Sequence, residues 1–121
     1  MTQQSRSKEA TEFSEWLRNQ REIDSSLGFV ASDIDYMWRN YRNNQWMLIE
    51  EKRRGVQVKF PQTETIKIIH NACKSDINYK GFHVIVFENT SPDDGRIYLD
   101  GIEIDRDKLI CFLRFEFDKL M

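Results

Sequence analysis

The sequence predicts an α/β fold in which a mixed sheet is flanked by helices. Apolar residues recur at helical spacing over residues 7–21 and 61–75. The segments 46–52 and 82–87 instead have the composition of buried strands. A chain of 121 residues is long enough to bury one hydrophobic core. We therefore expect a single domain over residues 1–121.

The composition is that of a globular protein, with 40% apolar and 31% charged residues. The net charge of −2 argues against a polycation that coats nucleic acid, although a local basic surface between residues 39 and 59 could still bind it. The N-terminus has no apolar run of a secretory signal, and no segment has 18 consecutive apolar residues. We expect a cytoplasmic protein that does not enter a membrane.

The first helix is expected over residues 7–21, with Phe13 and Trp16 on its apolar side. At 100° per residue, Glu9 falls inside the same apolar arc. Glu9 is therefore either an acid directed at the core side or a first-turn acid favoured by the helix dipole.

A hairpin is expected next. Residues 29–38 resemble a strand with a polar start, and residues 39–45, which include three Asn, resemble a turn. Residues 46–52 form the second strand, which continues directly from apolar into charged residues. Such a strand either ends in solvent with a charged tip or presents its charges in a site.

Because side chains alternate along a strand, Glu50 and Lys52 share one face, and Glu51 points to the other. Asp35 is expected near Glu50 across the hairpin. Asp33 shares the face of Asp35 and remains an alternative, with Asp35 the first choice. A carboxylate and an ammonium side by side at a strand end can hold a metal ion and polarise a water.

The second helix is expected over residues 61–75. Gln62 aligns with an apolar stripe that includes Ile66 and Ile69, which directs it at the sheet near the helix start. The alternative is a solvated or capping Gln62. His70 lies beside the stripe, where a lone histidine is more often a packing or surface residue than a ligand.

The remaining chain predicts a central strand at 82–87, buried on both faces, and a hairpin over 96–104 around Asp100-Gly101. Asp105 is expected to cap a last helix that runs to about residue 120. Its buried face would contain Leu109, Phe112, Leu113 and Phe117.

This order of elements resembles the PD-(D/E)XK nuclease superfamily. The signature of that superfamily, an Asp followed by apolar residues and then (D/E)-x-K at a strand end, is matched by residues 35–38 and by Glu50-Glu51-Lys52. The Pro of the motif is absent, since position 34 is Ile. The resemblance covers residues 9 to about 88. It implies a restriction-endonuclease-like αβββαβ core, to which the C-terminal hairpin and helix are an addition.

The implied activity is that of a Mg²⁺- or Mn²⁺-dependent endonuclease that hydrolyses phosphodiester bonds, and DNA is the expected substrate. Mg²⁺ prefers oxygen ligands, which suits Asp35 and Glu50, with the backbone carbonyl of Glu51 as a further ligand. Lys52 would orient or help deprotonate the attacking water and offset phosphate charge.

The resemblance also implies roles for residues outside the motif. Glu9 would be an accessory metal ligand, and Gln62 a positioning group. Arg53, Arg54 and Lys59 would hold the nucleic-acid backbone, a role that carries no sequence information; their alternative is a solvated charge run.

Two other functions remain open at this point. A non-catalytic module on the same fold could bind nucleic acid through the basic cluster. A protein-interaction domain would instead use its C-terminal aromatic residues to cover a partner. For a nuclease of this size, a homodimer or a larger partner that supplies specificity is also consistent with the sequence.

Overall fold

The computed structural model describes residues 12–29, 31, 33–54 and 60–120, and leaves the side chains of residues 60–63 undescribed. The chain divides into two compact units, Met1–Ala31 and Ser32–Met121.

In the first unit, residues 12–18 are helical, and two 3₁₀ turns follow at Arg21–Ile23 and Ser25–Leu27. The predicted helix thus ends earlier than residue 21. Its end is satisfied locally, because the side-chain amide of Gln20 donates to the carbonyl of Trp16 at 3.0 Å. Phe13 and Trp16, which were expected on one apolar side, stack on each other and are 62% and 56% exposed.

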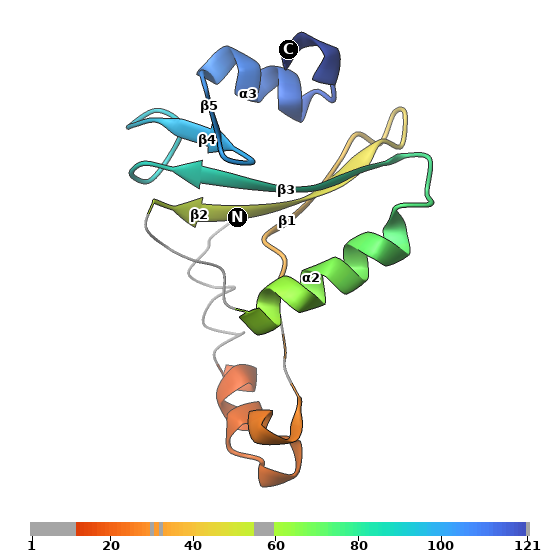
Figure 1. The fold of residues 1–121 in the computed structure, drawn as a ribbon, viewed down its shortest axis with the longest axis vertical. Helices are drawn as coiled ribbons and strands as arrows, with labels where there is room; N and C mark the ends of the chain where they lie inside the picture. Colours follow the sequence, from red (N-terminus) through yellow and green to blue (C-terminus); the bar gives the residue numbers. More distant parts are fainter. Residues whose placement is uncertain (1–11, 30, 32, 55–59, 121) are drawn as a thin grey trace. The chain divides into compact units, whose positions relative to one another are not determined.

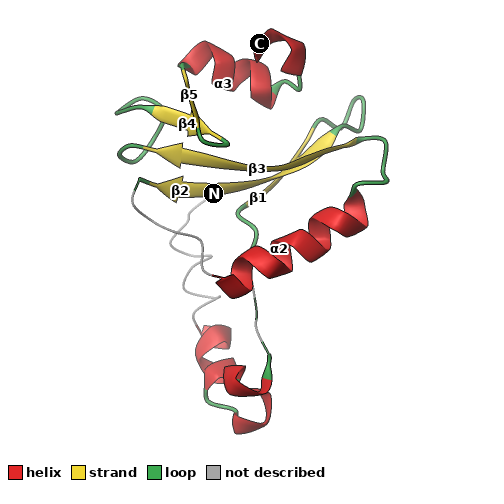
Figure 2. Ribbon diagram, in the orientation of Figure 1, coloured by secondary structure: helices red, strands yellow, loops and turns green. Residues whose placement is uncertain are grey.

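The second unit is built on a five-stranded mixed sheet with the strand order β1-β2-β3-β4-β5 (Figure 1). Helices α2 and α3 lie on opposite faces of this sheet (Figure 2). The α/β prediction is confirmed at this level, and β3 is the middle strand, as expected. The bounds are β1 Tyr36–Arg39, β2 Trp46–Arg53, α2 Phe60–Cys73, β3 Tyr79–Phe87, β4 Ile97–Leu99, β5 Ile102–Ile104 and α3 Arg106–Leu113.

Strands β1 and β2 form the predicted antiparallel hairpin, with Tyr36 paired to Ile49. The strand expected over 29–38 is shorter, since pairing begins only at Tyr36. In the loop, Asn44 adopts a positive φ of 66°, which Asn tolerates better than most residues. The Asn-rich segment therefore forms the turn that its composition predicted.

Strand β2 is followed by α2 and then by β3, which pairs with β2 in parallel. The helix begins and ends close to the predicted bounds, and Ile66 is buried, as its place on the apolar stripe predicts. β3 carries one extra residue between Tyr79 and Phe82, opposite Trp46 and Leu48 of β2.

Gly81 lies within this bulge, with a positive φ of 104°. Before the bulge, Tyr79 contacts Trp46 and His70 of α2. After it, His83 contacts Phe112 of α3. The bulge thus reverses which residues of β3 face each helix.

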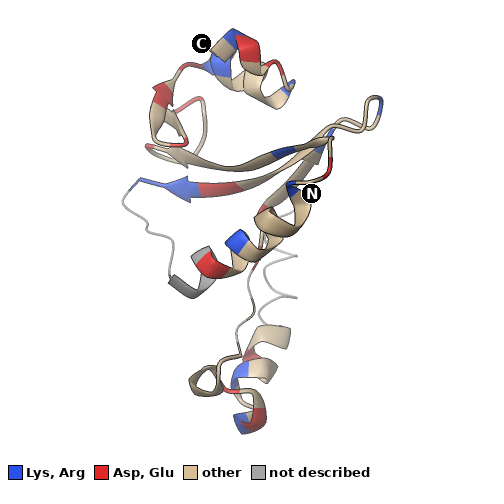
Figure 3. Ribbon diagram, turned by 45° about the vertical axis from the view of Figure 1, so that its right-hand side comes forward, with Lys and Arg blue, Asp and Glu red and all other residues tan. Residues whose placement is uncertain are grey.

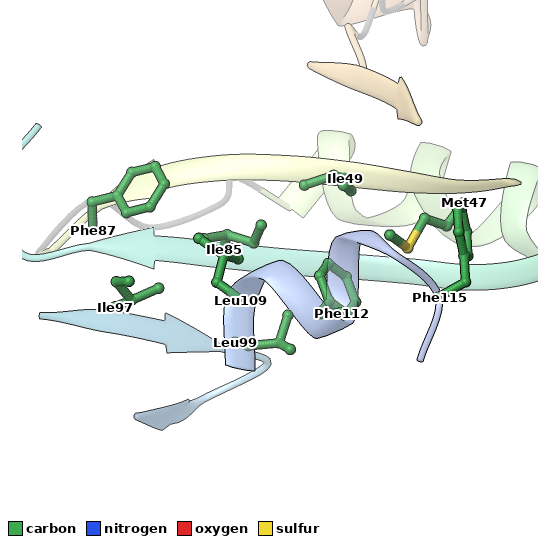
Figure 4. Packing of buried hydrophobic residues seen from close by; sticks show 9 residues of the cluster. All are labelled: Met47, Ile49, Ile85, Phe87, Ile97, Leu99, Leu109, Phe112 and Phe115. Atoms are coloured by element: carbon green, nitrogen blue, oxygen red, sulfur yellow. The ribbon is translucent and has the colours of Figure 1, made fainter. Parts of the chain in front are cut away.

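The main hydrophobic core lies between the sheet and α3 (Figure 4). Phe112 is its most deeply buried aromatic residue, at 1% exposure. The core is formed by Met47 and Ile49 of β2, Ile85 and Phe87 of β3, Ile97 and Leu99 of β4, Leu109 and Phe112 of α3, and Phe115.

Helix α3 begins as predicted, because the Asp105 carboxylate accepts a hydrogen bond from the Lys108 N–H at 2.8 Å. It ends at Leu113 and not near residue 120. Phe115 has a positive φ of 62°, and the Glu116 N–H reaches the carbonyl of Cys111, as in a Schellman termination. Glycine is usual at this position. Here the conformation places the Phe115 side chain in the core.

The β4–β5 turn at Asp100-Gly101 was also predicted, and both residues have the positive φ angles of a type I′ turn. The Asp100 carboxylate accepts hydrogen bonds from the backbone of Val84 and from His83 Nδ1, at 2.9 and 2.7 Å. The turn is therefore fastened to the central strand by a side chain.

The finer expectation of an αβββαβ core stays a prediction. Between the first helix and α2, the described residues form two strands, β1 and β2. Residues 29–35 are not in a strand at any described position.

Candidate functional site

Two carboxylates meet where β1 enters the sheet. Since Tyr36 pairs with Ile49, Asp35 lies opposite Glu50. The Asp35 N–H donates to Glu50 Oε1 at 2.9 Å, and the Glu51 N–H donates to Asp35 Oδ2 at 2.8 Å. Each acid is thus held by the backbone of the other segment, as the predicted hairpin requires.

Glu50 is almost completely buried, at 1% exposure, and among the described residues it is the only buried charged side chain. Burial raises the pKa of its carboxyl group above the usual value. The Asp35 N–H opposes this effect, the Asp35 charge adds to it, and Lys52 opposes it. The net result is a pKa above the ordinary value of a glutamate.

Lys52 shares the face of Glu50, as the alternation predicted. Its Nζ lies 3.7 Å from Glu50 Oε2, which is ion-pair distance but longer than a hydrogen bond, and its side chain is 18% exposed. The ammonium is therefore next to the buried acid and still reached by solvent. Figure 3 shows the sign change along β2, from acidic to basic residues at its end.

Glu51 points to the opposite face of the sheet, where its Oε1 accepts a hydrogen bond from the Tyr36 hydroxyl at 3.0 Å. Its main chain has a different role. In a strand, the N–H and C=O of one residue point to the same side, and the Glu51 N–H is bonded to Asp35. The carbonyl is therefore directed at the same edge of β2 as Asp35.

Asp33 and Asp35 differ in burial and in hydrogen bonding. Asp33 is exposed, whereas Asp35 is half-buried and exchanges hydrogen bonds with β2. Asp35 is the one of the two that the hairpin brings to Glu50.

The structure does not place all of the other candidate residues. Glu9 and Lys59 lie outside the described residues. Gln62 is in the first turn of α2, one turn before the buried Ile66, but its side chain is not described.

The two arginines at the end of β2 are exposed. Arg54 pairs with Glu88, with 3.6 Å between Nη1 and Oε2. This exposed ion pair is weak by the usual measure. Arg53 has no ion-pair or hydrogen-bond partner among the described side chains, so it is the better placed of the two to meet a ligand.

The donor set at this site suits a hard cation. Two carboxylates and one carbonyl provide oxygen ligands, and Mg²⁺ commonly keeps several waters in addition to one or two carboxylates. No group of three or more His, Cys, Asp or Glu side chains with metal-binding geometry occurs among the described residues. A cation here would thus need water or main-chain ligands to complete its coordination.

Sequence reasoning missed Tyr36 and the pair His83–Asp100. The signal for Tyr36 was available, because the hairpin register that pairs Asp35 with Glu50 also brings Tyr36 beside β2. His83 gave no such signal, since its contact with Asp100 depends on how β4 returns to β3.

Neither membrane-spanning helices nor similarity to known proteins gives further information about this site. None of the helices in the described part of the chain has the length and apolarity needed to cross a membrane. No protein-family model, curated protein or solved structure matches the chain.

Proposed function

We propose that this protein is a Mg²⁺- or Mn²⁺-dependent nuclease that hydrolyses phosphodiester bonds in DNA, with a restriction-endonuclease-like core. The supporting observation is the buried Glu50 carboxylate, hydrogen-bonded to the backbone of Asp35 and 3.7 Å from the Lys52 ammonium. The resemblance to the PD-(D/E)XK signature rests on these same three residues.

The burial of Glu50 is the main physical argument for a bound cation. Burying a carboxylate has a large desolvation cost, and the neighbouring Asp35 adds repulsion. The Asp35 N–H and Lys52, at 3.7 Å, offset part of this cost. A divalent cation bound by Asp35 and Glu50 would compensate both negative charges. This would explain why a carboxylate is buried at this position.

The roles of the residues follow from their positions. Asp35 and Glu50 hold the cation, together with the Glu51 carbonyl. Such an ion, when bound, supplies an acidified water and compensation for the charge on the phosphate. As an ammonium, Lys52 would orient the attacking water and stabilise the phosphate charge, and in its neutral form it would take up the proton of that water.

Residues around this centre would serve the substrate. Arg53 contacts the phosphate backbone, as does Arg54 once released from Glu88, and Lys59 follows them in sequence. Glu9 and Gln62 keep the accessory roles that the resemblance implies. A second copy or a larger partner would supply specificity, because so small a domain offers little surface beyond its site.

A non-catalytic nucleic-acid-binding module is the second candidate. It is favoured by the lack of a third ligating side chain near Asp35 and Glu50 among the described residues. In that case the acids are structural, and the basic end of β2 grips nucleic acid without cutting it.

The test is cleavage of linear duplex, nicked, branched and single-stranded DNA, and of RNA, with Mg²⁺ or Mn²⁺. We expect cleavage that stops with chelator, and a loss of about 10²–10⁴-fold in Glu50→Ala and Lys52→Ala. Lys67→Ala, which removes an exposed lysine of α2, is the matched control and should retain activity.

The outcomes separate the two candidates. If the wild type binds DNA but cuts none of these substrates with either metal, the binding module replaces the nuclease. If it neither binds nor cuts, both candidates fail. Circular dichroism of each variant establishes that a lost activity is not a lost fold.

A further inference from the structure

A cavity of about 370 Å³ lies on the α3 face of the sheet. It is distinct from the Asp35–Glu50 site, which lies on the α2 face. Its walls come from β1, β2, β3, α3 and the turn at 90–92. Most of the wall is apolar, and it includes Trp38, Ile49, Ile85, Phe87, Leu109 and Leu113. Figure 4 shows how four of these residues, Ile49, Ile85, Phe87 and Leu109, project into the same layer.

The polar groups of this cavity are few, and most are occupied. The Trp38 Nε1–H donates to the Leu113 carbonyl at 2.7 Å. The Ser91 hydroxyl accepts from the Asp93 N–H, and the Thr90 hydroxyl bonds Asp94 within the turn. These groups shape the cavity but are committed to their own partners.

Glu51 is the exception. Its carboxylate lines the cavity and receives one hydrogen bond, from the Tyr36 hydroxyl to Oε1. None of the described lining residues is a Lys, Arg or His, so no positive charge in the wall balances it. A carboxylate in an apolar wall selects for a cation whose remaining surface is apolar.

We propose that this cavity is a binding site for a small hydrophobic amine. The ammonium donates to the Glu51 carboxylate, and the apolar body lies against Ile85, Phe87 and Leu109. The size and lining agree with small-molecule sites, which are concave, mainly apolar and carry a few placed polar groups. The site is independent of the proposed nuclease activity.

The test uses three probes that share a phenylethyl body, with the full-length chain: 2-phenylethylamine, the neutral 2-phenylethanol and the anionic 3-phenylpropionate. Binding is followed by the methyl signals of Ile49 and Ile85 in NMR titrations. Ile23, which lines a separate hollow in the first unit, reports binding elsewhere. We expect saturable shifts at Ile49 and Ile85, and affinity for the amine about tenfold above that for the alcohol.

Two variants locate the charge. Glu51→Gln keeps an acceptor for Tyr36 and should reduce the amine's affinity to that of the alcohol. Glu103→Gln makes the same charge change on exposed β5 and should leave the tenfold preference intact. If Glu51→Gln does not fold, the wild-type series still decides.

The proposal fails if the wild type binds amine and alcohol equally or binds neither. It also fails if Ile23 alone responds, or if a folded Glu51→Gln keeps the preference for the amine.

Discussion

The two faces of β2 differ in what they bury. On the α3 face, Met47 and Ile49 join a continuous apolar core, and the one acid, Glu51, lies at its rim with a tyrosine partner. On the α2 face, Leu48 is followed directly by the buried Glu50. In a strand with only a structural role, we would expect the acidic residues of both faces at the solvent-exposed edge of the core. This difference supports the proposal of a cation site on the α2 face.

The largest expected effect is a loss of stability from a substitution on the α3 face. Phe112→Ala should lower the free energy of unfolding by about 3–5 kcal/mol, because it empties the centre of the core. Urea denaturation measures the loss. Ile110→Ala, at a more exposed position of the same helix, is the control and should cost much less. Equal losses in the two variants would mean that α3 does not define the core.

The next effect concerns the α2 face. A saturating divalent cation should stabilise the wild type, by about 2.7 kcal/mol at a hundredfold excess over Kd. Thermal melts with and without Mn²⁺ measure the gain. Asp35→Asn and Glu50→Gln should lose it, whereas Glu64→Gln, on an exposed part of α2, should keep it. A gain that persists in Glu50→Gln would place the cation elsewhere.

The smallest effect is a pH dependence on the α3 face. Burial lowers the pKa of His83, but hydrogen bonds to Asp100 and to the Lys80 carbonyl, with the charge of Asp100, outweigh it and raise the pKa above the ordinary 6.5. Both ring nitrogens face acceptors, which suits the imidazolium. Its contribution to stability is complete below pH 6.5 and is lost as the pH rises through the folded-state value.

Stability of the wild type and of His83→Gln should therefore be compared between about pH 5 and 8. The wild type should lose stability relative to the variant as the pH rises. Parallel stability profiles would show that the contact with Asp100 does not raise the pKa of His83 in the folded state above its value in the unfolded state.

Local patterns predicted much of the fold and of the candidate site. Alternation along β2 and the Asn-rich turn placed Asp35 opposite Glu50, because a hairpin register follows from its turn. The helical stripe gave Ile66. These predictions depend on neighbouring residues, and such information is contained in a short stretch of sequence.

What the sequence could not predict depends on packing between distant segments. The helix beginning at Asp105 was expected to continue to about residue 120, since nothing in its composition signals a stop. Phe115 ends it by adopting a conformation that is unfavourable for a bulky residue and that burial of its ring offsets. The Tyr36–Glu51 contact and the cavity likewise appear only once α3 and the sheet are assembled.

The bulge at Gly81 has a consequence for how the sequence can change. One extra residue sets Tyr79 toward α2 and His83 toward α3. Deleting a residue there would reverse the facing of the strand on one side of the deletion, and exchange polar for apolar residues along it. Substitution is restricted as well, because the φ of 104° disfavours any side chain, and a Cβ would lie 3.1 Å from the His83 ring. Because both faces of the sheet are covered by helices, the number of residues in the bulge and the residue type at position 81 are both constrained.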